Sequence, residues 1–255
     1  MLTAITREVN AGIGNCELTF LPRVRINADL ALQQHQQYQS VLSSLGCEIV
    51  TVSTESGLAD SVFIEDTAIV LDEIAVMCLP GVESRRAEVP GVGDVLQQYR
   101  TLASIQPPGT LDGGDLLRIG KVIYAGLSSR SNKSGIEQLR SIVADYGYCV
   151  ETVETTKCLH LKCAVSEVAP DSLLINPDWI SRSAFGNCEV IDVDKEESHA
   201  ANALCVGRSV IYPSSFPRTR EKLVRRGINV TPVDVSELQK AEGGVTCCSL
   251  IFTSK

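Results

Sequence analysis

The chain of 255 residues has 44% hydrophobic residues, and it is acidic, with 23 Lys and Arg against 31 Asp and Glu for a formal net charge of -8. This length allows a substantial buried core, and we expect a single domain over residues 1–255. The acidic balance, without a basic stripe or aromatic residues interleaved with arginines, disfavours a nucleic-acid-binding protein. The expected partner is therefore a small molecule.

The sequence has no run of about 18 apolar residues and no basic start followed by an apolar stretch, so we expect neither a membrane span nor a signal peptide. Its ten cysteines are scattered along the chain. Without an export signal they are expected to be reduced, which predicts a cytoplasmic protein. No paired CxxC spacing occurs, and this disfavours a structural zinc site.

Apolar runs along the chain form a unit that repeats about five times, a hairpin followed by a helix and another strand. The expected hairpins join residues 61–70 to 74–80, 115–119 to 122–127, 162–168 to 172–176, and 202–206 to 209–213. The expected helices cover residues 28–46, 94–102, 134–147 and 219–227. The expected third strands cover residues 47–52, 102–106, 148–154, 188–194 and 228–234.

The two ends of the chain supply the remaining hairpin if residues 245–255 pair with residues 2–9. Pairing the ends would close a ring of units and remove a free sheet edge. The sequence therefore predicts an α/β fold, a fivefold pseudo-symmetric propeller.

In such a ring the starts of the hairpins meet near the axis, and they carry most of the reactive side chains. Two adjacent cysteines lie at the start of the last strand, where successive side chains point to opposite faces. Cys248 shares its face with bulky apolar residues, so Cys247 is expected to face the site. The residues that converge are Glu65, Asp66, Asp112, His160, Asn202 and Cys247.

A cysteine, a histidine and an orienting carboxylate form a general pattern for covalent catalysis. The thiol needs a cationic neighbour or a bound cation to become a thiolate, and His160 or a cationic substrate would serve. Taken alone, His160 would be interpreted as a structural histidine in the core with satisfied hydrogen bonds. Asp112 would be interpreted as a turn residue of the sequence DGG. Glu65 and Asp66 lie within an apolar hairpin, where buried carboxylates need partners.

The chain resembles the dimethylarginine dimethylaminohydrolases, members of the pentein superfamily of guanidino-group modifying enzymes. The resemblance runs nearly end to end and rests on several motifs in the family's order. These motifs are FIEDTAIV, PGVESRRAEV, TLDGGDLL, GLSSRSN, LHLK and GGVTCCS. The resemblance implies a fivefold α/β propeller and hydrolysis of Nω-methylated arginines to citrulline plus methylamine or dimethylamine, a reaction of arginine and nitric oxide metabolism.

Carried over residue by residue, the resemblance makes Cys247 the nucleophile and His160 the general acid and base, supported by Asp112. It assigns Glu65 and Asp66 to the guanidinium group, and Leu18 to a lid over the site. It assigns Asp60 and the carbonyl of Ala241 to the α-amine, and Arg85 and Arg130 to the α-carboxylate. The implied reaction forms a covalent thiouronium on Cys247. It needs no cofactor, although zinc could inhibit at Cys247 and His160.

Three other interpretations stay open. Arginine, agmatine or another guanidino compound could be the substrate, although two arginines for an α-carboxylate count against agmatine. A non-catalytic binding protein could retain the same scaffold, since fold does not imply function. A redox or metal sensor could use Cys247 and Cys248 with His160, although no four-ligand spacing supports it. A homodimer is also left open.

Overall fold

The computed structural model describes residues 1–155 and 157–254, which form five three-stranded sheets. Residue 255, the last residue of the strand expected over residues 245–255, lies outside the described residues. In sheet order the strands are β15 (Leu250–Thr253), β1 (Leu2–Arg7) and β2 (Cys47–Val52); β3 (Ala68–Val70), β4 (Ile74–Met77) and β5 (Thr101–Ser104); β6 (Leu116–Ile119), β7 (Val122–Leu127) and β8 (Cys149–Glu154); β9 (Val165–Ala169), β10 (Ser172–Ile175) and β11 (Glu189–Asp192); and β12 (Leu204–Val206), β13 (Ser209–Pro213) and β14 (Asn229–Val233).

Every sheet has the same pattern, in which the middle strand pairs antiparallel with one neighbour and parallel with the other. Parallel neighbours need a long crossover, and helices supply it in most sheets. The helices are α1 (Ala28–Ser44), α2 (Val89–Leu96), α3 (Lys133–Ala144), α4 (Leu161–Ala164), α5 (Pro217–Arg225) and α6 (Ser236–Gln239). The crossover to β11 instead contains a short 3₁₀ helix, Arg182–Phe185.

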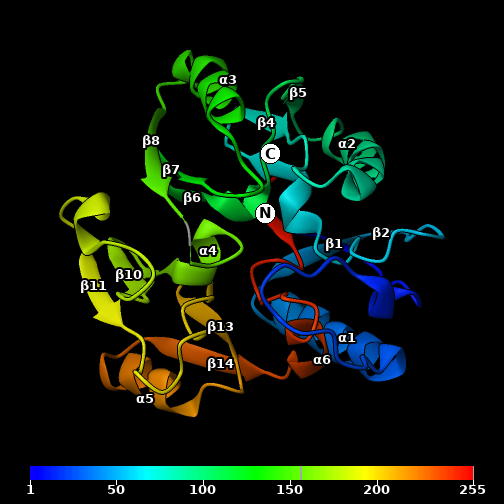
Figure 1. The fold of residues 1–255 in the computed structure, drawn as a ribbon. Coiled ribbons are helices and arrows are strands. Elements are labelled where there is room, and N and C mark those ends of the chain that lie inside the picture. The colour runs from blue at the N-terminus through cyan, green and yellow to red at the C-terminus, as the bar shows by residue number, and fades with distance from the viewer. Residues whose placement is uncertain (156, 255) are drawn as a thin grey trace.

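The sheets surround a central axis, and α1, α2, α3 and α5 lie outside them (Figure 1). In the sheet that closes the ring, β1 pairs antiparallel with β15, and Ile5 lies opposite Leu250. The pairing of the two chain ends predicted from the sequence is therefore confirmed, as is the fivefold α/β propeller. None of the described helices is long and apolar enough to cross a bilayer.

Helix α1 supports the turn that carries the paired cysteines. It begins after Asn27, whose side chain accepts a hydrogen bond from Leu30 N at 3.2 Å and so caps the helix. On its buried face, the Tyr38 hydroxyl donates to the carbonyl of Val245 at 2.9 Å and lies 2.7 Å from Ser249 Oγ. Val245 and Ser249 lie on either side of Cys247 and Cys248 in the chain, so the packing of α1 fixes the position of both cysteines.

The expected strands begin too early in the hairpins that carry the reactive residues. Residues 64–67 form the 3₁₀ helix Ile64–Thr67, and strand β3 starts only after it. Another 3₁₀ helix, Gly113–Asp115, precedes β6, and α4 precedes β9. Such turns satisfy backbone groups locally, as in the bond from Asp115 N to Asp112 O at 3.0 Å. The polar residues near the axis therefore lie on short helical turns rather than on strands.

Helix α2 was expected over residues 94–102 but lies at Val89–Leu96. Pro90 occupies the start of the helix, where its missing N–H costs nothing. Burial of Val92 and Leu96 then stabilises a segment whose glycines have poor helix propensity. The segment after residue 96 turns into β5 instead.

Candidate active site

Cys247 and Cys248 lie in the turn over residues 245–248, before β15 begins. The Sγ atom of Cys247 accepts a hydrogen bond from Gly244 N at 3.3 Å, and the side chain is half-buried. Cys248 is fully buried, with its Sγ 3.5 Å from the carbonyl of Gly244. Cys247 is thus the accessible member of the pair, as expected. Strand alternation is not the reason, because both residues belong to a turn.

His160 immediately precedes α4 and lies between two carboxylates. Its Nε2 is 3.0 Å from Asp112 Oδ2, and its Nδ1 is 3.8 Å from Asp66 Oδ1. Burial opposes the charged imidazolium, but Asp66 and the hydrogen bond with Asp112 outweigh it and raise the pKa of His160 to about 9. At neutral pH this histidine is therefore a cation and a proton donor.

The same two acids are held by backbone donors. Asp66 Oδ1 accepts from Gly114 N at 2.9 Å, and Asp112 Oδ1 accepts from Gly81 N at 2.9 Å. Burial raises the pKa of Asp66, but the positive charges of His160 and Arg85 outweigh it and lower the value to about 2. Asp66 is therefore ionised throughout the physiological range.

Asp115 is a further acid of this cluster, and sequence analysis did not single it out. Its Oδ1 accepts from Leu161 N at 2.9 Å, and its Oδ2 accepts from the hydroxyls of Ser128 and Ser131 at 2.6 and 2.7 Å. Burial raises its pKa to about 6. Its contact with Leu161 fixes the backbone beside His160. The second aspartate of the sequence DGGD was the signal that could have identified it.

The thiol of Cys247 faces negative charge. Partial burial, together with Glu65 and Asp66, raises the pKa of Cys247 well above its ordinary value. Glu65 forms an ion pair with Lys162 and accepts from Thr246 Oγ1 at 2.8 Å. Without a bound cation the sulfur is therefore protonated at neutral pH.

A small cavity of about 20 Å³ brings most of the expected residues together. Of the residues assigned to substrate, Leu18 and Glu65 do not line it: Leu18 packs against an apolar cluster, and Glu65 lines a separate cavity of about 260 Å³. Asp112 lies behind His160. The lining of the small cavity consists of Glu17, Asp60, Phe63, Asp66, Arg85, Arg130, Leu159, His160, Ala241, Glu242, Gly243 and Cys247.

Arg85 is almost completely bound by protein groups. Its guanidinium donates to Asp66 Oδ2 at 2.6 Å, and it makes a two-pronged contact with Glu88 at 3.1 and 2.7 Å. Burial opposes its charge, but Asp66 and Glu88 raise the pKa of Arg85 well above its ordinary value. Glu88 is a partner that sequence analysis missed, although its spacing of three residues in SRRAE is typical of an ion pair on a helical turn.

Asp60 and Arg130 provide opposite charges in the same cavity. Both carboxylate oxygens of Asp60 accept from Glu17 N, at 3.2 and 3.1 Å. Arg130 donates to Thr19 Oγ1 at 3.0 Å, and its Nη1 lies 4.0 Å from Asp112. An acid and an arginine in one small cavity suit the two charged groups of a free amino acid.

Two glycines allow the close packing around the reactive groups. A Cβ on Gly114 would lie 2.6 Å from His160 Nδ1, and a Cβ on Gly243 would lie 2.1 Å from the ring of Phe63. Both contacts are shorter than any side chain permits without movement. The glycines are therefore required by space and not by an unusual backbone conformation.

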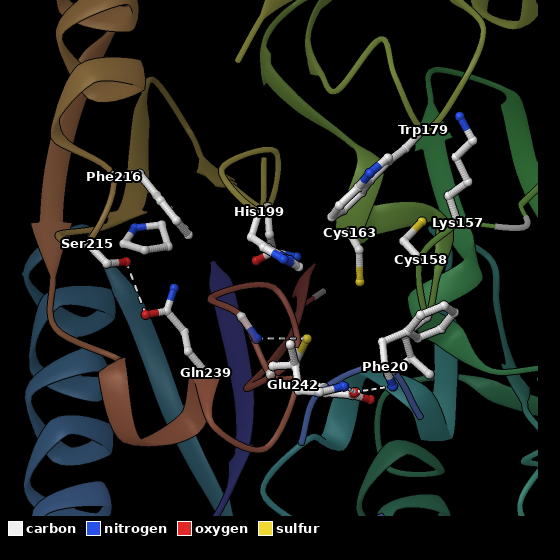
Figure 2. A pocket seen from close by; sticks show the side chains of 17 residues that line it. Phe20, Lys157, Cys158, Cys163, Trp179, His199, Ser215, Phe216, Gln239 and Glu242 are labelled. Atoms are coloured by element: carbon white, nitrogen blue, oxygen red, sulfur yellow. Dashed lines mark hydrogen bonds between the residues drawn. The ribbon is translucent and has the colours of Figure 1, made fainter. Parts of the chain in front are cut away.

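A larger cavity of about 400 Å³ is drawn in Figure 2. Its lining includes Cys247, which also lines the small cavity. Aromatic side chains from distant parts of the chain line the larger cavity, and Trp179 packs edge-on against His199 with ring centroids 5.0 Å apart. The two cavities share Leu159, Glu242, Gly243 and Cys247. The sulfur therefore lies between a charged space and a mainly apolar one.

Over residues 1–155 and 157–254, one group of candidate metal ligands has donor atoms within 4.8 Å of one another, namely Asp66, Asp112 and His160. Cys247 does not belong to this group. Zinc shared by Cys247 and His160, left open above, stays a prediction.

Comparison with known proteins identifies the family. A family model described as N,N dimethylarginine dimethylhydrolase, eukaryotic, matches residues 22–252. The N(G),N(G)-dimethylarginine dimethylaminohydrolase of Pseudomonas aeruginosa is 36% identical over 224 residues, which cover 87% of this chain and 88% of that protein. The protein of the same name from Streptomyces coelicolor is 35% identical over 257 residues, with 97% and 95% covered.

Solved structures agree with this result. A cysteine-to-serine mutant of the Pseudomonas aeruginosa enzyme, complexed with citrulline, matches with a TM-score of 0.95 and 33% identity, covering 99% of this chain and 100% of that one. The N-terminal domain of ArgZ, bound covalently to a reaction intermediate, matches with a TM-score of 0.89 at 18% identity, covering 100% and 98%, and shows the shared pentein fold alone. The chain therefore belongs to the dimethylarginine dimethylaminohydrolase family of enzymes.

Proposed function

We propose that this enzyme hydrolyses Nω-methylated arginines, asymmetric dimethylarginine and monomethylarginine, to citrulline plus dimethylamine or methylamine. One observation carries the proposal: half-buried Cys247 and His160 line the same cavity as Asp66, Asp60 and Arg130. The cavity therefore combines a nucleophile and a proton donor with charges that match a guanidino amino acid.

In the first step the cationic guanidinium docks on Asp66, next to the sulfur. Burial and the acidic neighbours Glu65 and Asp66 raise the pKa of Cys247 in the free enzyme. The positive charge of the bound substrate lowers the pKa of the thiol again, and its proton is lost to solvent. The thiolate attacks the guanidinium carbon and forms a tetrahedral adduct. The sulfur thus becomes a reactive thiolate only after the cationic substrate has bound.

His160 supplies the proton that the departing amine needs. With a pKa of about 9 it is protonated before the reaction starts, and its proton transfer breaks the carbon–nitrogen bond and leaves a thiouronium on Cys247. Neutral His160 then takes a proton from water, which attacks the thiouronium carbon. Citrulline is released, and the thiolate is restored.

The amino-acid end of the substrate determines which guanidine is accepted. We place its α-ammonium at Asp60 and the carbonyl of Ala241, and its α-carboxylate at Arg130 with Arg85. Two observations support Arg130: it lines the cavity, and its guanidinium donates to a neutral hydroxyl, Thr19 Oγ1. Arg85 is held by Asp66 and Glu88, so its role includes fixing Asp66 beside the guanidinium.

Parallel assays of ureido-product formation test this assignment: citrulline from asymmetric dimethylarginine, monomethylarginine and arginine, and carbamoylputrescine from agmatine. Turnover of the methylated arginines alone supports it. Turnover of arginine with no methylated substrate would instead indicate a deiminase, and no turnover of any guanidine would favour a binding protein.

We further propose that residues 1–255 act as a single catalytic domain in the cytoplasm. All ten cysteines are free thiols, which suits a reducing compartment. A homodimer and a role in nitric oxide metabolism stay predictions; sedimentation of the purified protein would decide the first.

A further inference from the structure

Glu242 makes an unusual set of contacts with the segment that precedes α1. Its Oε2 accepts from Thr19 N at 3.0 Å, and its Oε1 accepts from Phe20 N and Leu21 N, each at 2.5 Å. Figure 2 shows the contact with Phe20 at the edge of the large cavity. Three successive backbone donors on one carboxylate form an anion-binding turn of the kind that holds phosphates. Here the anion is a side chain of the same protein.

Residues 17–21, here named the cover segment, are also attached to the small cavity. Glu17 N donates to Asp60, the Ser84 hydroxyl donates to Glu17 Oε1 at 2.7 Å, and Arg130 donates to Thr19 Oγ1. Asp60 and Arg130 are the residues placed above at the α-ammonium and α-carboxylate. The cover segment is thus held by the groups expected to bind substrate and, in addition, by Glu242, which is assigned to nothing.

The space beneath the cover segment is too small for a substrate. A cavity of about 20 Å³ holds roughly one water molecule, which needs at least about 10–15 Å³. A guanidino amino acid is many times larger. The small cavity joins a larger one of about 400 Å³ at Cys247, but the cover segment itself occupies hydrogen-bonding groups of Asp60 and Arg130. Binding of a substrate at these two residues therefore requires the cover segment to shift.

The backbone of Glu242 supports a specific role for its side chain. Its φ is +60°, in the left-handed region that residues with a Cβ disfavour. Glycine would suit this position better on conformational grounds. A strained residue persists only where surrounding contacts fix it, and the three hydrogen bonds to the cover segment are such contacts.

Glu242 is also connected to the nucleophile through a short, tightly packed stretch of chain. The next residue, Gly243, packs against the ring of Phe63 with no room for a Cβ. Gly244 N then donates to Cys247 Sγ. Glu242 therefore lies two residues from the backbone donor that contacts the sulfur.

We propose that Glu242 is a positioning residue that holds the cover segment closed over bound substrate and ties this closure to the turn that carries Cys247. The proposal rests on the proposed function. Its central contact, however, is measurable without any turnover.

Hydrogen–deuterium exchange of the amides of Thr19, Phe20 and Leu21 tests the contact. Replacing Glu242→Gly removes the carboxylate and also relieves the backbone strain, so this variant should fold at least as well as the wild type. Its amides should exchange at least about 10-fold faster, the change expected for the loss of a charge-assisted hydrogen bond. Glu242→Gln, which keeps one acceptor oxygen, should give an intermediate rate and serves as the second variant.

Asp171→Gly is the matched control, because Asp171 is the other non-glycine residue with positive φ among the described residues and lies in a remote hairpin turn. It should leave the exchange of the cover segment unchanged. Unchanged exchange in both Glu242 variants would overturn the proposal, whether or not the protein hydrolyses methylated arginine.

Kinetics test the positioning role. The KM for asymmetric dimethylarginine should rise by about 10-fold in Glu242→Gly, in proportion to the weakened closure, while Asp171→Gly keeps the wild-type value. Faster exchange with unchanged KM and kcat would overturn the role in substrate closure. A wild-type protein that turns over no methylated arginine would instead contradict the proposed function, and the exchange result would still decide the contact.

Discussion

His160 Nε2 lies 3.0 Å from Asp112 Oδ2, and both side chains are buried. The contact fixes the orientation of the imidazole and stabilises its charged form. Because Asp66 stands near the opposite ring nitrogen, the imidazole has a carboxylate on each side. In the proposed mechanism, the acid–base chemistry of His160 therefore depends on these two flanking carboxylates.

Asp112→Asn should lower kcat by at least about 100-fold, because general acid–base catalysis contributes roughly 10²–10⁴-fold. The substitution removes a charge that raises the pKa of His160 in the free enzyme, so the decline in kcat/KM at high pH should shift to lower pH. Steady-state kinetics over a pH series measures both effects. Asp72→Asn, which breaks an exposed ion pair with Arg118, is the control. An unshifted pH profile in Asp112→Asn would contradict the account.

The wild-type kcat/KM should fall as pH rises through about 9. His160 must be protonated to release the amine, and its pKa in the free enzyme is raised to about 9, above an unfolded value of about 6.5. The same shift stabilises the folded state fully below about pH 6.5, and this stability is lost as pH rises through about 9. Profiles of kcat/KM and of unfolding free energy against pH test the two statements. A kcat/KM that keeps rising beyond pH 10 would disprove the role of His160 as acid.

The two adjacent cysteines should differ in what their removal costs. Cys247→Ser should abolish turnover and leave the fold intact, since its side chain is half-buried. Cys248→Ala should retain turnover but lose about 1 kcal/mol of stability, because it leaves a small cavity in the core. Denaturant unfolding and citrulline assays separate the effects, with exposed Cys149→Ala as control. Loss of turnover in Cys248→Ala with full stability would reverse the assignment.

Glu88→Gln should destabilise the protein by about 3 kcal/mol, because it breaks a buried ion pair with Arg85. For a chain of this size this corresponds to a fall in Tm of roughly 6–12 °C. Glu55→Gln, whose partner Arg7 lies 3.7 Å away and whose own side chain is exposed, should cost less than about 1 kcal/mol. Similar Tm values for the two variants would show that Arg85 does not depend on Glu88.

Most of the propeller was predictable because its units repeat local patterns. The strand expected over residues 47–52 coincides with β2 (Cys47–Val52), and the pairing of the chain ends followed from an incomplete unit. The helical turns before β3 and β6 were not predictable. Their form depends on distant partners, such as the bond from Glu65 N to Cys247 O at 3.1 Å.

Some residues of the candidate site were likewise predictable from the sequence repeat, and others were not. Cys247, His160 and Asp66 occupy equivalent positions in different units, so the repeat alone indicated that they converge. Asp115 and Glu242 instead accept hydrogen bonds from the backbone of Leu161 and Thr19, which are 46 and 223 residues away in the chain. Contacts over such separations have no local sequence pattern, and they became visible only in the folded chain.

Mass spectrometry of enzyme quenched in acid during turnover of asymmetric dimethylarginine tests whether Cys247 forms the proposed covalent intermediate. We expect a mass increase equal to the substrate less dimethylamine, located on the peptide that contains Cys247 and missing in Cys247→Ser. An adduct on Cys158 or Cys163, which line the larger cavity, or citrulline formation by Cys247→Ser at the wild-type rate, would contradict it.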